Sequence, residues 1–480
     1  MKRIEFFRWF VSLCVTAAVV CLFTASSMSC TTILVGKKLT ADGAVIHGHN
    51  EDMGFTAVGR LWSVPEATHA TGTTLDVPYT KIPQPAKTYR YWASGNAHAT
   101  TGLGISKESR PYDSVLVGMN EWGVTMSCNW MYSKEENLPG KGIRRYAIRQ
   151  LILERAKTAR EAVQVIADFI ENYGQADWGG LDYCLADPKE AWVVETTSKH
   201  WVAKRVKDDE FIVVANRFII GKDFDLASKD LVDFAKNRGW YNPAKGAFSF
   251  RDAYGLPERM NSAYDKDRES RANDLLSGRK GFIAPEDLFL VLRDRYEGTS
   301  LYHKAVTNME HWEDVTDKLL IPRAIDTNLC QSSTVAQLRS DLPAELGPVM
   351  WYAPATPSFS GYFPVYAGAT RIPESFSSVN SAYYPGSAWW TFRLLQKIGD
   401  ASHDQVHTQI LNFWTANHAY LIHMQKTLEE KVLGLLKQGK KAEAMSLLNT
   451  FNYSQAEQTL YHANRMLRSM QELTKNVPVW

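Results

Sequence analysis

Two short apolar runs on either side of a tight turn constrain the start of this chain more than any other feature. Residues 31–35 are β-branched or apolar, and residues 44–49 form a second run of the same kind. Ala41-Asp42-Gly43 lies between them. An Asp-Gly pair between apolar runs is typical of a β-hairpin. The sequence therefore predicts that the two runs pair as antiparallel strands.

The position of the turn also predicts which residues of the hairpin face each other. With the turn centred between residues 40 and 42, the numbers of paired residues sum to about 80 to 84. Cys30 then lies opposite residues 50 to 54, and directly opposed residues have Cβ atoms about 5 Å apart. We therefore expect Asn50, Glu51 and Asp52 to return beside Cys30.

The residues before Cys30 have the three parts of a secretory leader. Lys2, Arg3 and Arg8 form a basic region, residues 9–25 are apolar, and Ser27-Met28-Ser29 supplies small residues before the cut. Cleavage between Ser29 and Cys30 would make Cys30 the first residue of an exported protein, either periplasmic or extracellular. The apolar run is short for a membrane span, and no other stretch approaches 18 uninterrupted apolar residues. We expect no stable membrane span after cleavage.

Four cysteines remain after the predicted cut: Cys30, Cys128, Cys184 and Cys330. Four cysteines in a chain of this length do not form a disulfide scaffold. Cys128 and Cys184 lie in apolar segments, which favours buried, inert thiols. Whether Cys128, Cys184 and Cys330 pair is left open by the sequence.

The composition is that of an ordinary globular protein. Of the 480 residues, 45% are hydrophobic and 22% charged, and the formal net charge is +2. With no basic tract, the chain has no electrostatic footprint for nucleic acid. A homo-oligomer is compatible with this composition.

The order of predicted elements indicates an α+β fold. A second hairpin (114–119 and 124–130) precedes two helices (142–156, and one from a capping box at Thr158-Ala-Arg-Glu161 to Gly174). An antiparallel meander follows at 182–186, 191–196, 200–204 and 211–215, then helices at 258–276 and 285–295, strands at 332–338 and 349–353, and helices from 387 to 473. Residues 56–112 are interpreted as mainly loops, with a short strand at 88–92. We divide the chain into a leader (1–29), a catalytic domain (30–385) and a helical extension (386–480).

A cysteine at a free N-terminus carries a nucleophile and a base in one residue. An α-amino group has a pKa of about 7.7 to 8.0 and a cysteine thiol about 8.5, so the amine can accept the thiol proton. Asp52 is the candidate carboxylate that orients the amine. Asn216 and Asn129, each at the end of a predicted strand, are candidate donors to an oxyanion.

The same residues belong to a longer ordered set of motifs. The set comprises Cys30-Thr-Thr-Ile-Leu-Val-Gly-Lys-Lys, Asp42-Gly43, Asn50-Glu-Asp52, Gly118-Met-Asn-Glu-Trp-Gly123 with Asn129, Glu195 in Trp-Val-Val-Glu-Thr, Val213-Val-Ala-Asn216, Gln331-Ser-Ser-Thr-Val and Met350-Trp-Tyr-Ala-Pro. It resembles the dipeptidase A family of cysteine N-terminal-nucleophile hydrolases, which are related to secernins, bile-salt hydrolases and penicillin V acylases. The resemblance covers nearly the whole chain after the leader.

This resemblance implies a four-layer αββα sandwich with the nucleophile at the start of an inner strand. It also implies hydrolysis of dipeptides through a thioester, without a metal or another cofactor. Cys30 would be nucleophile and base, Asp52 would bind the amine, and Asn129 and Asn216 would form the oxyanion hole. A second family arginine corresponds to Arg271.

Position 49 departs from the pattern of the relatives. Bile-salt hydrolases have an arginine where this chain has His49, so a permanent charge is replaced by a group that titrates. We assign His49, Asn50 and Glu51 to substrate binding because they neighbour the nucleophile. His47, His49 and Glu51 alternate along one strand and share a face, but a metal would need another ligand, so we expect no metal site.

Two other functions are compatible with these residues. The same machinery could hydrolyse a non-peptide amide, such as an acylated amino acid. Alternatively, Cys30 could be acylated as in bacterial lipoproteins, which would give a lipid-anchored binding protein without activity. A lipoprotein usually has Leu three residues before the cysteine, where this chain has Ser27.

Overall fold

The structure is a computed structural model that describes residues 30–53, 57–97, 100–101, 104–105, 112, 114–136, 140–177, 179–302, 323–378, 383–401 and 403–473. The predicted leader and its cleavage site at Ser29 lie outside these residues, except for Cys30 itself.

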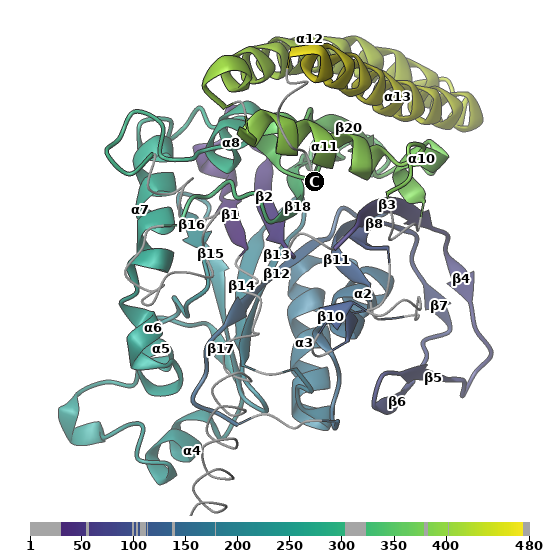
Figure 1. Cartoon of the computed structure of the whole chain (residues 1–480). Helices are drawn as coiled ribbons and strands as arrows, with labels where there is room; N and C mark the ends of the chain where they lie inside the picture. The colour runs from purple at the N-terminus through teal and green to yellow at the C-terminus, as the bar shows by residue number, and fades with distance from the viewer. Residues whose placement is uncertain are drawn as a thin grey trace, which may run out of the picture.

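Two large antiparallel sheets form the centre of the described part of the chain (Figure 1). The six-stranded sheet has the order β16 (Phe211–Val214), β1 (Thr31–Val35), β2 (Val45–Asp52), β18 (Cys330–Leu338), β19 (Pro348–Pro354) and β20 (Phe363–Tyr366). The eight-stranded sheet has the order β17 (Leu226–Ala227), β15 (Trp201–Val206), β14 (Ala191–Thr196), β13 (Gly180–Ala186), β12 (Thr125–Met131), β11 (Val115–Asn120), β8 (Tyr91–Asn96) and β3 (Gly59–Val64). β1 and β2 contact β12 and β13, so the two sheets are stacked.

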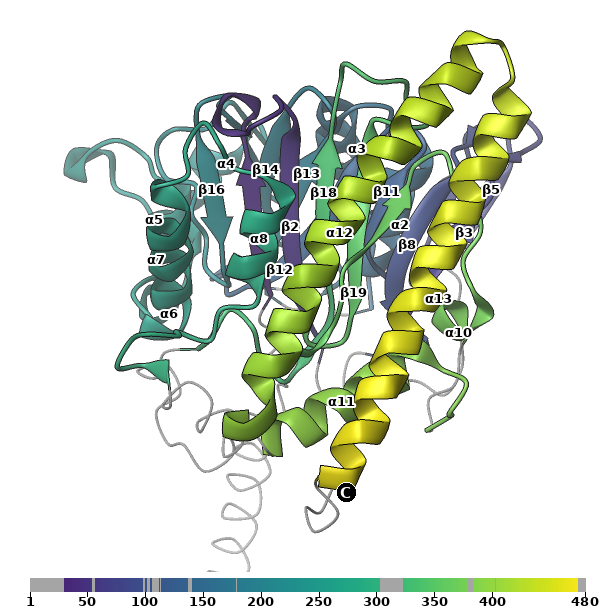
Figure 2. The ribbon, with the colours of Figure 1, turned by 90° about the horizontal axis from the view of Figure 1, so that it is seen from above.

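Helices cover the outer face of each sheet. Helices α2 (Arg145–Arg155) and α3 (Ala159–Tyr173) lie on the eight-stranded sheet, and α7 (Ala263–Ser277) and α8 (Pro285–Leu292) lie on the six-stranded sheet. Figure 2 shows that the long α12 (His403–Lys437) and α13 (Lys441–Leu473) run side by side above the six-stranded sheet, with α11 (Ala388–Ala401) beneath them. The predicted αββα sandwich with C-terminal helices is therefore confirmed.

The remaining elements are short and lie at the periphery. They are η1 (Lys37–Leu39), β4 (Ala67–Thr68), β5 (Thr74–Val77), β6 (Thr80–Pro83), β7 (Lys87–Thr88), β9 (Thr100–Thr101), β10 (Gly104–Ile105), α4 (Leu231–Asn237), η2 (Pro243–Lys245), α5 (Phe250–Tyr254), α6 (Pro257–Met260), η5 (Pro357–Phe359) and α10 (Glu374–Ser377).

The first hairpin has the predicted register. Thr31 pairs with Asn50 and Val35 with Ile46, so the numbers of paired residues sum to 81. In the turn, the Asp42 carboxylate accepts a hydrogen bond from Ala44 N at 3.1 Å, and Gly43 has a φ of 74°, which favours glycine. Continuing this register by one residue places Glu51 opposite Cys30.

The helix pair on the eight-stranded sheet also follows its sequence signals. Thr158 accepts a hydrogen bond from Glu161 N at the start of α3, and Gly174 ends the helix with a φ of 76°. The apolar residues of α3, among them Ile166 and Ile170, are fully buried against the sheet. The amphipathic spacing therefore sets which face of the helix packs.

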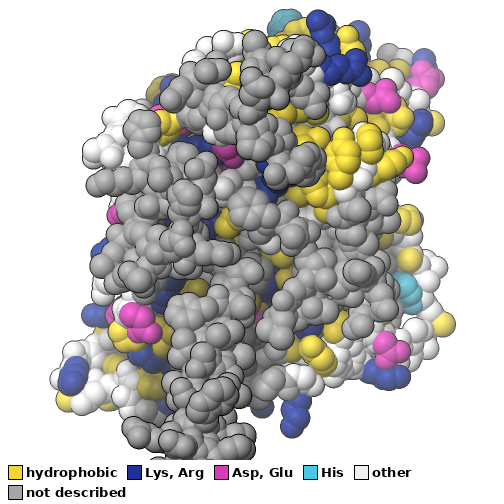
Figure 3. All heavy atoms as spheres, in the orientation of Figure 1, with side chains coloured by type: hydrophobic (Ala, Val, Ile, Leu, Met, Phe, Trp, Pro, Cys, Tyr) yellow, Lys and Arg dark blue, Asp and Glu magenta, His cyan; other side chains and the backbone are white. Residues whose placement is uncertain are grey.

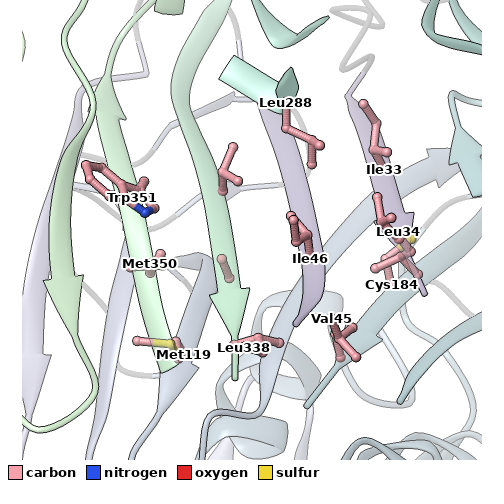
Figure 4. Packing of buried hydrophobic residues seen from close by; sticks show 14 of the residues in the cluster. Ile33, Leu34, Val45, Ile46, Met119, Cys184, Leu288, Leu338, Met350 and Trp351 are labelled. Atoms are coloured by element: carbon pink, nitrogen blue, oxygen red, sulfur yellow. The ribbon is translucent and has the colours of Figure 1, made fainter. Parts of the chain in front are cut away.

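The core extends across both faces of the six-stranded sheet. Figure 4 shows Ile33 and Ile46 on neighbouring strands, Leu288 of α8 above β2, and Met119 and Cys184 from the other sheet. Leu288 comes close to β2 because Gly48 has no side chain, and a Cβ there would lie 2.8 Å from Leu288 Cδ2. Gly48 therefore lets α8 approach the strand that carries the polar cluster.

Two regions differ from the sequence prediction. The strand at 211–214 does not continue the meander of β13 to β15 but crosses to the other sheet, where it pairs with β1. Residues 59–64 and 91–96, which were expected to be mostly loop, form β3 and β8 of the eight-stranded sheet. In β8 the small and polar residues Ser94, Gly95 and Asn96 are buried, so the strand has no clear apolar alternation.

Hydrophobic side chains are exposed near α11 (yellow in Figure 3, over α10 and α11 of Figure 1). The exposed aromatic residues of this part of the chain include Tyr383 and Tyr384, just before α11, and the Tyr383 ring lies 6.0 Å from the Trp390 ring. None of the helices in the described residues combines the length and apolarity needed to cross a bilayer.

Candidate active site

Cys30 lies directly before β1, where its backbone is held from two sides. Its carbonyl oxygen accepts a hydrogen bond from Asn129 Nδ2 of β12 at 3.1 Å and another from Arg268 Nη1 of α7 at 2.9 Å. The side chain is only 2% exposed. The eight-stranded sheet and helix α7 each supply one donor to this carbonyl, and the two hydrogen bonds together fix the backbone position of Cys30.

The Cys30 thiol faces a carboxylate. Its Sγ donates to Glu51 Oε1 at 3.6 Å, as the hairpin register places these two residues opposite each other. Burial raises the pKa of Cys30 well above its usual value, and the negative charges of Glu51 and Asp52 raise it further. The backbone N–H of Asp52 and the guanidinium of Arg149 oppose this rise. In this environment the thiol needs a base to ionise.

A continuous hydrogen-bonded chain leads from the thiol to the second sheet. Asn129 Nδ2 donates to carbonyl oxygens, so Asn129 Oδ1 is the acceptor for Thr32 Oγ1–H at 2.7 Å. Thr32 Oγ1 then accepts from His49 Nδ1–H at 2.7 Å. His49 Nε2 lies 3.1 Å from Glu51 Oε2. The imidazole of His49 therefore bridges Thr32 and Glu51 through its two ring nitrogens.

Arg149 of α2 completes the surroundings of Glu51. Its Nη1 lies 3.6 Å from Glu51 Oε2, and its Nη2 donates to the Cys128 carbonyl oxygen at 3.0 Å. Burial alone would raise the pKa of Glu51, but Arg149 and the bond to His49 lower it below its usual value. Glu51 is therefore a buried anion held by cationic partners, in the position that the sequence assigned to substrate binding.

Asp52 lies on the other face of β2, toward the helices. Its Oδ2 accepts a hydrogen bond from Arg323 Nη2 at 2.9 Å. Its Oδ1 is buried and accepts no hydrogen bond from any residue that the structure describes. Burial raises the pKa of Asp52, although Arg323 and Arg268 oppose this. One oxygen of a carboxylate whose charge acts on Cys30 thus remains as an acceptor.

The two predicted oxyanion donors are in different environments. The Asn129 amide donates to the carbonyl oxygens of Cys30, Val214 and Ala215 at 3.1, 3.1 and 2.9 Å, so it ties β12 to β1 and β16. Asn216 donates from Nδ2 to the Trp130 carbonyl oxygen at 2.9 Å and accepts from Arg268 Nη2 at 2.8 Å. Arg268 therefore links Asn216 to the Cys30 carbonyl.

The structure corrects the choice of arginine on α7. Arg271 forms an ion pair with Asp294 and donates to the Glu297 carbonyl oxygen, and it is not brought to Cys30. Arg268, one turn earlier, contacts Cys30 and is fully buried. The spacing on α7 gives a signal for this: Arg268 lies four residues before the buried Ala272, on the same face, whereas Arg271 does not.

Two polar residues of β2 are also placed away from the thiol. Asn50 faces the helical layer, where its Nδ2 donates to the carbonyl oxygens of Leu292 and Ile325 at 2.8 and 3.0 Å. Side chains alternate between the two faces of a strand, so Asn50 lies on the face opposite His49 and Glu51, and the prediction that it binds substrate with them did not account for this. His47 does share their face, but its ring nitrogens contact Thr125 and Ser127 at 2.9 Å each.

Arg149 was not predicted as a site residue. It lies on a helix in which most neighbours are buried and apolar, and Arg145 and Arg149 are spaced by four residues on that helix. A pair of arginines at this spacing on a buried helix indicates a buried anion nearby, which is the signal that could have found it.

Cys30, Cys128, Cys184 and Cys330 are all buried and unpaired as thiols.

The comparisons with known proteins agree with these motifs. Residues 29–416 match the model of peptidase family C69. The chain belongs to peptidase family C69. It is therefore a peptidase, and the resemblance to the dipeptidase A family is confirmed.

Curated relatives of this C69 peptidase cover most of its length. It is 26% identical over 401 residues to a "Probable dipeptidase" of Latilactobacillus sakei, which covers 77% of this chain and 80% of the relative. It is 29% identical over 387 residues to a "Probable dipeptidase" of Salmonella dublin, covering 73% and 84%. With a "Probable dipeptidase B" of Streptococcus pyogenes serotype M3 the identity is 26% over 476 residues, covering 90% and 91%.

Solved structures with similarity to the C69 peptidase are more distant. The penicillin V acylase of Agrobacterium tumefaciens has 15% identity and a TM-score of 0.37, covering 74% of this chain and 89% of that one. A mutant of the conjugated bile acid hydrolase of Clostridium perfringens has 14% identity and a TM-score of 0.39, covering 75% and 98%.

Proposed function

We propose that this chain is an exported dipeptidase that uses Cys30, exposed as the N-terminal residue by removal of its leader, to hydrolyse dipeptides. The observation that carries the proposal is the environment of Cys30: a buried thiol at the start of an inner strand, with its carbonyl held by Asn129 and Arg268. The relatives named as probable dipeptidases support the substrate class. The leader-like residues before Cys30 support export.

Cleavage before Cys30 supplies the base. In the uncut chain the Cys30 nitrogen belongs to a peptide bond and cannot accept a proton. The amine released by cleavage can accept the thiol proton and become an ammonium group. Asp52 Oδ1, which has no hydrogen-bond donor among the described residues, is the acceptor that orients this group.

The next step is acylation of the Cys30 sulfur. The Cys30 sulfur attacks the carbonyl carbon of the dipeptide, and the negative charge moves to the carbonyl oxygen. The side-chain amide of Asn216, which Arg268 links to Cys30, is the proposed oxyanion donor. The C–N bond breaks as the ammonium gives its proton to the leaving amine, which leaves a thioester on Cys30.

Hydrolysis of the thioester restores the enzyme. The amine accepts a proton from water, the resulting hydroxide attacks the thioester carbonyl, and the C–S bond breaks. The thiolate takes the proton back from the ammonium, so the first amino acid leaves as a carboxylic acid. Arg268 positions both Cys30 and Asn216 through this cycle, because it contacts the two residues at the same time.

Two measurements test this proposal. The intact mass of the exported protein shows whether the chain begins at an unmodified Cys30. A panel of dipeptides and acylated amino acids then shows which bond is cleaved. Dipeptide turnover by a protein with an unmodified N-terminal Cys30 supports the proposal. Turnover of acyl-amides alone contradicts the dipeptidase assignment, and an added diacylglycerol on Cys30 contradicts the mechanism.

A further inference from the structure

Three different metal-binding side chains converge at the end of the first hairpin. Cys30 Sγ, a ring nitrogen of His49 and a carboxylate oxygen of Glu51 all lie within 4.8 Å of one another. Each of the three residues is at most 2% exposed. Thiolate, imidazole and carboxylate are the usual protein ligands of Zn²⁺.

The spacing of these atoms is close to that around a tetrahedral zinc ion. Zinc binds sulfur at about 2.3 Å and nitrogen or oxygen at about 2.0 to 2.2 Å, so neighbouring ligands lie about 3.6 Å (S to O) and about 3.4 Å (N to O) apart. The observed separations are 3.6 Å between Cys30 Sγ and Glu51 Oε1 and 3.1 Å between His49 Nε2 and Glu51 Oε2, so the two carboxylate oxygens face one donor each. A cation bound by all three residues would lie between the thiol and the imidazole, on the carboxylate side of both.

The hydrogen bonds around His49 prepare it as a ligand. The contact between His49 Nδ1 and Thr32 Oγ1 fixes the ring with Nε2 directed at Glu51, so a metal that takes the place of a proton at Nε2 finds this nitrogen already oriented. A metal-binding histidine is usually fixed in this way, through a hydrogen bond at its other nitrogen. Arg149 Nη1 lies 3.6 Å from Glu51 Oε2 and holds the carboxylate from the opposite side. Both ligands are therefore oriented without a metal being needed to order them.

The other candidate ligands of β2 do not take part. His47 uses both ring nitrogens on Thr125 and Ser127. Asp52 faces the opposite side of the strand and binds Arg323. Strand alternation puts His47, His49 and Glu51 on one face, but His47 is held by Thr125 and Ser127. The third candidate ligand beside His49 and Glu51 is therefore Cys30.

We propose that Cys30, His49 and Glu51 bind Zn²⁺ or a divalent cation of similar preference, and that this cation reversibly inhibits the peptidase. After leader removal the α-amine of Cys30 is the fourth donor, since the amine and the thiolate of one cysteine form a five-membered chelate ring. Binding transfers the thiol proton, and the amine proton if present, to solvent. Thiolate and carboxylate then balance the two charges of the cation.

The inhibition, unlike the binding, rests on the proposed function. A coordinated thiolate cannot attack a substrate carbonyl, and a coordinated amine cannot accept a proton. The cation therefore blocks the nucleophile and the base together. A protein with arginine in place of His49 lacks the imidazole donor, so the proposed site depends on His49.

Cobalt provides a readout that does not depend on activity. Titrating the mature protein with Co²⁺ is expected to give one bound ion per chain and an absorption band of thiolate-to-cobalt charge transfer. The variant His49→Gln should weaken binding by about 100-fold or more, because it removes one of the ligands. His47→Gln is the matched control: it changes a buried histidine of the same strand face and should bind Co²⁺ as the unchanged protein does.

Binding and inhibition are then separated by measuring dipeptide hydrolysis with Zn²⁺ and with a chelator. One equivalent of Zn²⁺ should abolish turnover, and the chelator should restore it. A thiolate–cobalt band without any dipeptide turnover would uphold the site and contradict the proposed function. Equal Co²⁺ binding by His49→Gln and the unchanged protein, or turnover that is unaffected by a bound equivalent of Zn²⁺, would overturn the proposal.

Discussion

The guanidinium of Arg268 joins the carbonyl oxygen of Cys30 to the side-chain oxygen of Asn216, at 2.9 and 2.8 Å. The three residues come from α7, the start of β1 and the segment after β16. One buried cation thus fixes the geometry between the proposed nucleophile and the proposed oxyanion donor.

Replacement of Arg268 should therefore reduce catalysis. Arg268→Lys keeps a charge but cannot contact both residues, and we expect kcat to fall by about 100-fold or more with a small change in KM. Arg271→Lys is the matched control on the same helix and should change kcat by less than about threefold. Steady-state kinetics with a dipeptide measure both. Equal losses in the two variants would show that Arg268 has only a structural role.

Cys30 should be indispensable for turnover and dispensable for folding. Cys30→Ser is nearly isosteric, so we expect an unchanged circular dichroism spectrum and a rate reduced by about 10³-fold or more. Cys128→Ala removes another buried thiol and should retain activity, because this thiol lies in the core of the eight-stranded sheet and not at the start of β1. Full activity of Cys30→Ala would refute the mechanism.

Substitution of Asn129 should mainly lower stability, whereas substitution of Asn216 should mainly lower kcat. Asn129→Ala removes a donor from the carbonyl oxygens of Cys30, Val214 and Ala215, and we expect a loss of about 3 kcal/mol in the free energy of unfolding. Asn216→Ala should lower kcat by about 10² to 10³, the usual effect of removing an oxyanion donor. Denaturant unfolding and kinetics on both variants compare the effects. The assignment of Asn216 fails if its variant loses stability but not kcat.

The buried acids Asp182 and Glu195 predict a pH dependence of stability. They are cross-strand neighbours on β13 and β14, and burial raises both pKa values. The charge of Asp182 raises the pKa of Glu195 further, and that of Glu269 raises the pKa of Asp182. Between the ordinary carboxyl pKa of about 4 and the raised values, the folded chain binds more protons than the unfolded chain, so stability falls as pH rises.

Asp182→Asn should make this dependence weaker. We expect the free energy of unfolding to change by on the order of 1 to 3 kcal/mol less between pH 5 and pH 8 than in the unchanged protein. Thermal unfolding at several pH values measures the difference. An equally steep pH dependence in the variant would show that other groups cause it.

Local patterns in the sequence were sufficient for the hairpin and the layers. The turn at Asp42-Gly43 predicted that residues 50 to 54 return opposite Cys30, and the observed register agrees with this. The apolar spacing of α3 and its cap at Thr158 predicted a helix with the right start and end. In each case the interacting residues are near in sequence, so periodicity and turn chemistry determine the outcome.

Long-range partners could not be predicted in this way. Arg268 lies 238 residues from Cys30, and nothing in the pattern of α7 states which strand that helix will cover. The pairing of β16 with β1 in the other sheet could not be predicted either, because a short apolar strand fits both sheets equally well. Asp52 and Glu51 were correctly placed near Cys30, but only the observed pairing shows which of them faces the thiol.

The three hydrogen bonds of Asn129 make the sandwich resist sliding of one sheet over the other. They run from the eight-stranded sheet to β1 and β16 of the six-stranded sheet, so they stretch as soon as one sheet slides over the other. Separation of the outer helices would leave them intact. Shear between the sheets is thus the deformation that would first separate Asn129 from Cys30, whereas Cys30 and Asn216 lie beside neighbouring strands of one sheet and would move together.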